Sequence, residues 1–189
     1  MDLFNIGIRL RDPDDPKEEI DRQLSCCFTG HRSSKLPAGG SRSSTRIKAL
    51  ISRIDLMIRE MIENEGVRFF LSGMASGADL LCAEAVVRLK NIYPQIELYC
   101  ISPYLGHVRE MKSADELYTY GLVREKAFQC VTLSDSYYKE CYRARNDYLV
   151  SHCAHMIAVF DPTKTRSGTA MALNIARAQE LDIKVITDY

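Results

Sequence analysis

The chain alternates between two kinds of segment, and this alternation limits the folds open to it more than any other feature. Short apolar runs predict strands at residues 24–28, 67–71, 96–101, 130–133, 156–160 and 183–187. Apolar residues spaced three and four apart predict helices at residues 47–62, 79–91, 114–128, 139–153 and 169–181. Strands that alternate with helices in this way favour an α/β fold.

The order of the predicted elements places the turns that can bind a ligand on one edge of the sheet. We expect a three-layer sandwich, in which a mostly parallel sheet of about six strands lies between helices on both faces. Right-handed crossovers put every strand-to-helix turn at the carboxyl ends of the strands. Ligands of open parallel sheets bind beyond those ends. The residues that follow each strand are therefore the first candidates for a functional site.

The length of 189 residues fits one domain, which we expect to cover residues 23–189. Residues 1–22 are polar, and their Asp-Pro-Asp-Asp-Pro run at 12–16 breaks any regular element. We therefore interpret residues 1–22 as an N-terminal arm or tail.

Charge and hydropathy argue against several partners. Lys plus Arg and Asp plus Glu balance at 25 each, so no net field draws the chain to nucleic acid or to an anionic membrane. No apolar run is long enough to span a bilayer, and the N-terminal segment lacks the basic-then-apolar order of a secretory signal. We accordingly expect a cytoplasmic protein for which nucleic acid is an unlikely partner and a membrane is not a partner.

The seven cysteines form no C-x-x-C pair, which indicates small buried thiols in a reducing compartment rather than disulfides. His152, Cys153 and His155 straddle a helix end and a strand start, so their side chains need not converge. We expect no metal and no cofactor.

The turn after the second predicted strand reads Ser-Gly-Met-Ala-Ser-Gly-Ala-Asp at residues 72–79. Its two glycines would let the backbone approach a ligand closely, and the amides of the following helix would attract a phosphate or another anion. A tight strand-to-helix turn can also require glycine for its own packing, and this turn alone does not decide between the two interpretations.

Other turns at the same edge carry similar chemistry. Arg32 can pair with a phosphate through two parallel hydrogen bonds, Tyr104 can stack on a base, and His31 is either a catalytic base or a neutral hydrogen-bonding residue. Tyr137, Tyr138, Tyr142 and Tyr148 either stack on bases or pack on a helix surface. The candidate ligand-binding residues are Thr29, Gly30, His31, Arg32, Ser72, Gly73, Met74, Gly77, Asp79, Arg145, Asn146, Ser167, Gly168 and Thr169.

Four motifs occur in a fixed order along the chain. They read C-F-T-G-H-R at 27–32, S-G-M-A-S-G-A-D at 72–79, R-N at 145–146 and S-G-T at 167–169. Together they resemble the SLOG superfamily, most closely its YpsA-like bacterial branch and more distantly the Lonely guy phosphoribohydrolases and the DprA DNA-processing proteins. The resemblance implies a Rossmann-like fold with a site for nucleotides or nucleotide-derived small molecules at the carboxyl edge.

The chain departs from the phosphoribohydrolase pattern at one position. Those relatives use an arginine early in a helix and a glutamate three residues after the threonine of a P-G-G-x-G-T loop. By position, Arg145 matches the arginine and Thr169 the threonine, but the glutamate falls on Ala172. Cleavage of an N-glycosidic bond needs a carboxylate. Asp79, Asp135, Asp147 or Asp161 could supply it, and the spacing selects none of them.

We therefore interpret the chain as a sensor or regulatory protein that binds a nucleotide or nucleotide-derived small molecule, with no assigned catalytic residue. One alternative is a nucleoside monophosphate N-glycosidase. A further alternative is single-stranded DNA binding, for which a local basic stripe is available at Arg32, Lys35, Arg42, Arg46 and Lys48. Residues 102–116 are either a lid that orders when the ligand binds or a passive surface loop, and a homodimer is a possible assembly.

Overall fold

The computed structural model describes residues 20–163, 167–187 and 189. Within this part of the chain one sheet contains β1 (Ser25–Gly30), β2 (Phe69–Ser72), β3 (Glu97–Ser102), β4 (Gln129–Thr132), β5 (His155–Val159) and β6 (Asp182–Ile186). Every predicted strand is present, with its ends displaced by one or two residues. The apolar runs were therefore a sound guide to the sheet.

The strands lie in the order β4-β3-β2-β1-β5-β6, and every pair is parallel. From β1 the chain proceeds outward on one side as far as β4, and then returns to the other side of β1 to form β5. The direction of winding thus reverses between β1 and β5, where Gly30 is aligned with Val159. In open parallel sheets the crevice for a ligand lies beyond the carboxyl ends of the two strands at such a reversal.

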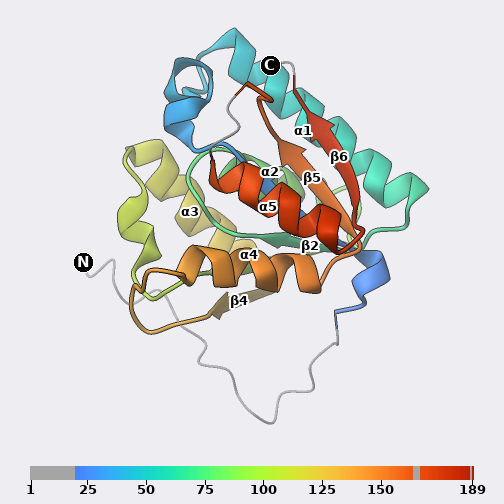
Figure 1. Cartoon of the computed structure of the whole chain (residues 1–189). Coiled ribbons are helices and arrows are strands. Elements are labelled where there is room, and N and C mark those ends of the chain that lie inside the picture. Colours follow the sequence, from blue (N-terminus) through green and yellow to red (C-terminus); the bar gives the residue numbers. More distant parts are fainter. Residues whose placement is uncertain (1–19, 164–166, 188) are drawn as a thin grey trace.

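The long helices are α1 (Thr45–Asn64), α2 (Ala78–Leu89), α3 (Ala114–Lys126), α4 (Cys141–Ser151) and α5 (Gly168–Ala178), and all of them were predicted. Helices α1, α2 and α3 pack on one face of the sheet, whereas α4 and α5 pack on the other, in front of the sheet in Figure 1. The three-layer α/β sandwich is therefore confirmed, and its winding is Rossmann-like.

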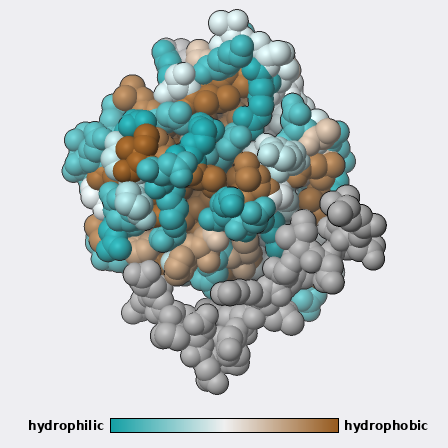
Figure 2. All heavy atoms as spheres, turned by 180° about the vertical axis from the view of Figure 1, so that it is seen from behind, coloured by the Kyte–Doolittle hydropathy of each residue, from teal (hydrophilic) through white to brown (hydrophobic). Residues whose placement is uncertain are grey.

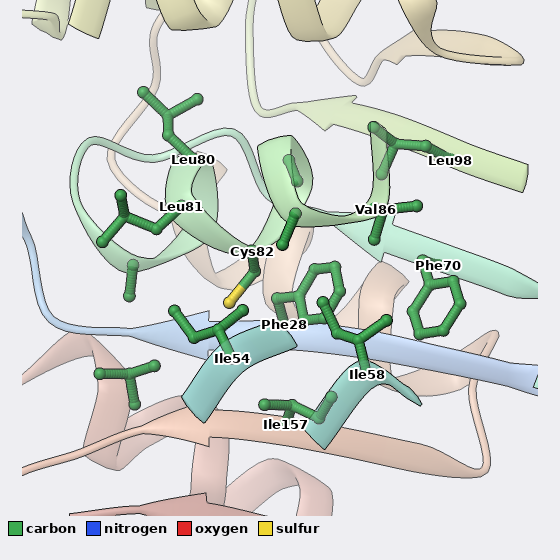
Figure 3. Packing of buried hydrophobic residues seen from close by; sticks show 14 of the residues in the cluster. Phe28, Ile54, Ile58, Phe70, Leu80, Leu81, Cys82, Val86, Leu98 and Ile157 are labelled. Carbon is green, nitrogen blue, oxygen red and sulfur yellow. The ribbon is translucent and has the colours of Figure 1, made fainter. Parts of the chain in front are cut away.

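One face of the sheet holds the larger part of the core. The buried stripe of α1 includes Ile47, Leu50, Ile54 and Ile58, whose spacing of three or four residues keeps them on one side of the helix. Helix α2 packs on the sheet beside α1, with Cys82 near Ile54 and Phe28 in Figure 3, and nine of its twelve residues are buried. Each methylene group that is buried on folding contributes roughly 0.8 kcal/mol to the free energy of unfolding. The glycine turn that precedes α2 is thus attached to a well-packed helix.

The opposite face has a smaller core, formed by Leu149 and Val150 of α4 and by Leu173 and Ala176 of α5 against the sheet. All seven cysteines are free thiols; six are buried and Cys130 is partly buried, so the prediction of buried thiols is confirmed for those six.

The surface is mixed in character. Seen from behind, apolar areas are divided by hydrophilic side chains (Figure 2). Leu56 and Ile92 are among the exposed apolar side chains. No helix in the described part of the chain is both long enough and apolar enough to cross a membrane.

Residues 20–22 of the predicted arm pack against the domain. The Asp21 side chain accepts a hydrogen bond from the Gln23 amide at 2.9 Å, and the Arg22 carbonyl accepts one from Ala154 at 2.9 Å. Ile20 packs against the smaller core. The rest of the predicted arm, residues 1–19, lies outside the described residues.

Candidate functional site

His31 joins three segments at the reversal point of the sheet. Its amide donates to the Val159 carbonyl at the end of β5 (3.2 Å), and its carbonyl accepts from the Ala78 amide at the start of α2 (3.1 Å). Its Nε2 atom accepts a hydrogen bond from the Asp161 amide at 3.0 Å. A neutral imidazole that accepts at Nε2 carries its proton on Nδ1. This geometry suits the neutral, hydrogen-bonding interpretation of His31.

Two of the candidate glycines bring segments of the chain together. At Gly77, where φ is +86°, a Cβ atom would lie 2.5 Å from both the His31 carbonyl oxygen and the Ser33 amide nitrogen. At Gly30, a Cβ atom would lie 2.3 Å from the Cβ of Ala78. Neither position tolerates a side chain without movement of the backbone or of a buried neighbour. The internal-packing interpretation therefore accounts for glycine at both places.

The turn between β2 and α2 satisfies its own polar groups. The Ser72 hydroxyl donates to the Asp79 carbonyl (3.1 Å) and accepts from the Met74 amide (3.2 Å). The Asp79 carboxylate accepts a hydrogen bond from the Ala75 amide at 3.3 Å. Met74 has a positive φ of 57° and a completely buried side chain. This turn is a closed unit from which the Gly73 carbonyl projects toward α4.

Arg145 receives that carbonyl and lies almost wholly inside the protein. Its side chain is 8% exposed; Nη1 donates to the Gly73 carbonyl and lies 3.5 Å from Oδ2 of Asp79. Its Nε atom donates to Oδ1 of Asn146 at 3.0 Å. A Cβ atom on Gly73 would lie 1.9 Å from Nη1, so glycine is required for this contact. Among the described residues, Nη2 of Arg145 has no hydrogen-bond partner.

The charges around Arg145 influence one another. Burial raises the pKa of Asp79, and the opposing attraction of Arg145 and then of Arg32 limits the rise. Burial likewise lowers the pKa of Arg145; Asp79 opposes this shift and the nearby positive charge of Arg32 adds to it. The two guanidinium groups, from the turn after β1 and from α4, therefore belong to one site.

Arg32 has a partner of a different kind. Its Nη1 atom lies 3.0 Å from Oε2 of Glu110, with the two side chains 36% and 30% exposed. Glu110 ends the short 3-10 helix η4 (His107–Glu110), which follows β3. The hydroxyls of Tyr104 (2.9 Å) and Tyr142 donate to the other carboxylate oxygen, Oε1. The guanidinium of Arg32 also lies over the Tyr142 ring, 5.6 Å from its centre.

These contacts stabilise the ionised form of Glu110. Burial by itself would raise its pKa, but the hydroxyls of Tyr142 and Tyr104 and the charge of Arg32 together hold the pKa below its usual range. Glu110 is therefore a carboxylate at neutral pH, and it neutralises Arg32.

His107, in the same 3-10 helix, is enclosed by the rings of Tyr104, Tyr120 and Tyr142, with ring centres 5.6 to 6.5 Å away. Its side chain is 1% exposed, and neither ring nitrogen has a hydrogen-bond partner among the described residues. Burial, with a contribution from Arg145, lowers its pKa to about 4. The ring is therefore neutral at pH 7 and carries an unmet hydrogen-bonding capacity.

Glu110 and Tyr142 were not among the predicted site residues. Glu110 lies in the predicted lid, 78 residues from Arg32 in sequence, and Tyr142 fitted a packing role on its helix equally well. The one available signal was their place after β3 and at the start of α4, both at the carboxyl edge.

Other candidates lie at the same edge, and within the described residues no hydrogen bond or ion pair joins them to the two arginines. Thr29 lies in β1 beside Ala158. Ser167 caps α5 by accepting a hydrogen bond from the Ala170 amide at 3.2 Å; Gly168 is exposed and Thr169 is buried. The preceding residues 164–166 lie outside the described residues.

The possible metal ligands face different partners. His152 contacts the Tyr148 carbonyl at 2.7 Å, and His155 lies 3.5 Å from Asp182. No group of three or more His, Cys, Asp or Glu side chains in the described residues could hold a metal ion.

The other two arginines of the basic stripe each have their own partners within the protein. Arg42 pairs with Glu84 at 2.7 Å and donates to Thr119 at 3.1 Å. Arg46 donates to the backbone oxygen of Tyr189 through Nε and Nη2. With Arg32 paired to Glu110, the stripe does not present these charges freely.

Two cavities meet at Leu36, in the loop between β1 and α1. One, of about 510 Å³, is lined by Lys35, Leu36, Pro37, Arg46, Asp161, Thr187 and Tyr189. The other, of about 250 Å³, is lined by Ser33, Leu36, Gly39, Gly40, Ser41, Arg42, Gly77, Leu80, Leu81, Ser113, Asp115, Glu116 and Thr119. Neither includes Arg145 or Glu110, so both are separate from the cluster described above.

The chain is similar to two bacterial proteins over most of its length. It is 27% identical to the UPF0398 protein BH1768 of Halalkalibacterium halodurans over 174 residues, which cover 86% of this chain and 87% of that protein. It is 26% identical to the SPbeta prophage-derived protein YoqJ of Bacillus subtilis over 148 residues, or 72% of this chain and 84% of YoqJ.

A solved structure shares the fold. DNA processing protein A of Helicobacter pylori, described by its single-stranded DNA binding mode, superposes with a TM-score of 0.59 over 90% of this chain and 68% of that protein, at 16% identity. At that identity the likeness supports the fold alone.

The family comparison is more specific than any single relative. The model of the YspA SLOG family (YpsA) matches residues 26–189, which include the glycine turn, both site arginines and the cap of α5. The chain therefore belongs to the YpsA-type SLOG family.

Proposed function

We propose that the protein binds a nucleotide or nucleotide-derived small molecule at the carboxyl edge of the sheet and acts as a sensor or regulator. The observation that carries this proposal is the state of Arg145, whose side chain is 8% exposed and whose Nη2 atom has no partner among the described residues. Nη2 is not among the described side-chain atoms that are buried without a partner, so this donor is accessible to solvent or to a ligand. A charge-assisted hydrogen bond to it would be stronger than one between neutral groups. Arg32 supplies a second positive charge beside it.

The neighbouring rings suit the rest of a nucleotide. Tyr104, Tyr137 and Tyr142 lie edge to face or tilted, with their centres 5.6 to 6.4 Å apart, and Tyr137 is 60% exposed. A base can stack on such a surface while its phosphate pairs with an arginine. The combination of anion-binding and aromatic groups favours a nucleotide over a simple anion.

Calorimetry and thermal shift with AMP, ADP-ribose, NAD and short linear or cyclic oligonucleotides test the proposal. We expect micromolar binding of at least one of them and a weakening of about tenfold or more in Arg32→Ala, because a charge-assisted hydrogen bond contributes about 1.5–3 kcal/mol. Arg88→Ala is the matched control: its side chain is 40% exposed and ion-paired with Asp55, outside the site. If none of these ligands binds the wild-type protein, the proposal is wrong.

A second candidate function is hydrolysis of a nucleoside monophosphate at its glycosidic bond. Of the four aspartates that could replace the missing glutamate, Asp79 is the one in contact with Arg145. Its raised pKa is a property that catalytic carboxylates share. Incubation with purine and pyrimidine monophosphates should then release free base, and Asp79→Asn should abolish the release. Release at the rate of buffer alone excludes this candidate.

Single-stranded DNA binding is the third candidate. The ion pair of Arg42 with Glu84 and the hydrogen bond from Arg46 to the Tyr189 backbone oxygen argue against it. Phosphate contacts supply most non-specific affinity for DNA. A salt-titrated gel shift with an oligonucleotide should therefore show no complex at physiological salt. A cytoplasmic location and a homodimer remain part of the sensor proposal, and size-exclusion chromatography with and without a bound nucleotide tests the dimer.

A further inference from the structure

The carboxylate of Glu110 occupies a set of donors that converge from three separate elements. Arg32 comes from the turn after β1, Tyr104 from the turn after β3, and Tyr142 from the first turn of α4. Nη1 of Arg32 is 3.0 Å from Oε2, and the Tyr104 hydroxyl is 2.9 Å from Oε1. A guanidinium and two hydroxyls around one oxyanion are the donor set that a phosphate also requires.

We propose that these donors form the subsite for an anionic group of the ligand, a phosphate above all, and that Glu110 fills the subsite until the ligand displaces it. This inference rests on the proposed function and specifies which atoms recognise the anion. The carboxylate of the chain and the phosphate of the ligand would compete for Arg32, Tyr104 and Tyr142.

The segment that carries Glu110 can move away from the three donors. It lies between two anchors, the end of β3 at Ser102 and Met111, which is 5% exposed and packs in the larger core. Between them, the Leu105 amide donates to the Ser134 carbonyl at 2.8 Å, Gly106 has a φ of +89°, and η4 is a single turn whose His107 and Val108 pack inward. Residues 106–110 can therefore move away while Tyr104, Leu105 and both anchors stay in position.

His107 favours that movement. Its two ring nitrogens are buried without a partner among the described residues. In the closed segment they therefore lose their hydrogen bonds to water and gain none from the protein. When the segment opens, water can reach the ring. The contacts of Glu110 stabilise the closed state of the segment, and the unpartnered nitrogens of His107 destabilise it. The free energies of the closed and open states are therefore close enough for a ligand to shift the equilibrium.

The experiment compares wild type with Glu110→Gln, which keeps the shape of the side chain and removes its negative charge. The probes are inorganic phosphate, AMP and adenosine, titrated by calorimetry at pH 7.5 and constant ionic strength. We expect the Kd values for phosphate and AMP to fall by about tenfold or more in Glu110→Gln. In this variant the ligand no longer competes with an internal carboxylate for the three donors. The Kd for adenosine, which carries no anion, should change less than about twofold.

Glu97→Gln is the control, because Glu97 is a partly buried carboxylate paired with Lys90 at the opposite end of β3. It should leave all three affinities unchanged. If wild type binds AMP and Glu110→Gln binds AMP and phosphate no more tightly, the subsite is wrong although the proposed function stands. If Glu110→Gln binds phosphate more tightly but neither protein binds a nucleotide, the subsite stands and the proposed function fails. If neither protein binds phosphate or AMP, the subsite is wrong, and the screen with ADP-ribose, NAD and oligonucleotides decides the proposed function.

Hydrogen exchange of the wild-type protein keeps the proposal testable should Glu110→Gln fail to fold. The amides of His107, Arg109 and Met111 donate to the carbonyls of Tyr104, Gly106 and Val108 at 3.0 to 3.3 Å. Saturating phosphate or AMP should speed their exchange as Glu110 is released, whereas a lid that orders when the ligand binds would slow it. Slower or unchanged exchange at these three amides overturns the displacement.

Discussion

Arg145 and Arg32 belong to one site, but the protein holds them in opposite ways. Arg145 is buried, and its partners are a backbone carbonyl and a buried carboxylate on a well-packed turn. Arg32 is about one-third exposed, and its partner stands on a one-turn helix between two anchors. The comparison teaches that one charge of the site is part of the fold, whereas the other can exchange its partner. We call Arg145 and the glycine turn the floor of the site, and η4 with Glu110 its cover. A ligand therefore meets a floor that is fixed and a cover that it can displace.

Removing the fixed charge should have the largest effect. Arg145→Ala leaves Asp79 buried without its counter-ion and the Gly73 carbonyl without its donor, so we expect a loss of about 3–5 kcal/mol in the free energy of unfolding. Urea unfolding followed by circular dichroism measures it. Arg143→Ala, on the same helix with a 64% exposed side chain, should change stability by less than about 0.5 kcal/mol. Similar losses in the two variants would show that Arg145 is not structural.

The floor should also be sensitive at its tightest contact. Gly77→Ala places a methyl group 2.5 Å from the backbone of residues 31 and 33 at a φ of +86°. Backbone strain and overpacking predict a loss of about 2–3 kcal/mol in the same unfolding experiment. Gly168→Ala is the control, because no atom lies within 4 Å of its added Cβ and it begins a helix. Equal stability of Gly77→Ala and wild type would mean that the close approach to residues 31–33 is relaxed in solution.

The cover should contribute less, and its contribution should depend on pH. The folded-state pKa of Glu110 is lowered, so the stability that its ionised form provides is present above the unfolded value of about 4.3 and is lost as the pH falls through the folded value. Glu110→Gln should therefore be about 1 kcal/mol less stable than wild type at pH 7, and the difference should shrink on acidification below about pH 4. A difference that grows in acid would contradict the assigned sign.

The smallest expected effect has the opposite sign. His107→Phe replaces a buried ring with two unpartnered nitrogens by an apolar ring of similar shape, so stability should stay level or rise by up to about 1 kcal/mol. His152→Phe should instead cost stability, because its Nδ1 atom contacts the Tyr148 carbonyl at 2.7 Å. If His107→Phe is the more damaging of the two, His107 has a partner in solution and the cover is held more firmly than we infer.

The fold was readable from the sequence because its signals are local. The spacing of Ile47, Leu50 and Ile54 predicts the buried stripe of α1, and the apolar runs predict the strands to within two residues. The approximate location of the site was readable for the same reason, since each turn follows a predicted strand. These signals need no knowledge of how distant segments meet.

The partners within the site were not readable, because they depend on distant pairings. Nothing in the residues around Glu110 indicates that its carboxylate meets Arg32, 78 positions away. The glycines illustrate the same limit: Gly77 fits a ligand-approach turn and a packing turn equally well until the backbone of residues 31–33 is seen against it. A pattern can identify the residue that a position requires without identifying the neighbour that requires it.

The three links made by His31 have a consequence for redesign of this protein. Its amide and carbonyl bind the main chain of two other segments whatever side chain stands there, whereas its ring alone accepts the hydrogen bond of the Asp161 amide, so a substitution would loosen the chain after β5 before it altered recognition. In the described part of the chain, residues 106–110 and the first turn of α4 make their main-chain hydrogen bonds only with residues close to them in sequence. A library of variants confined to those positions should sample new ligand preferences while the protein continues to fold. Ligand specificity could then change without a change in the fold.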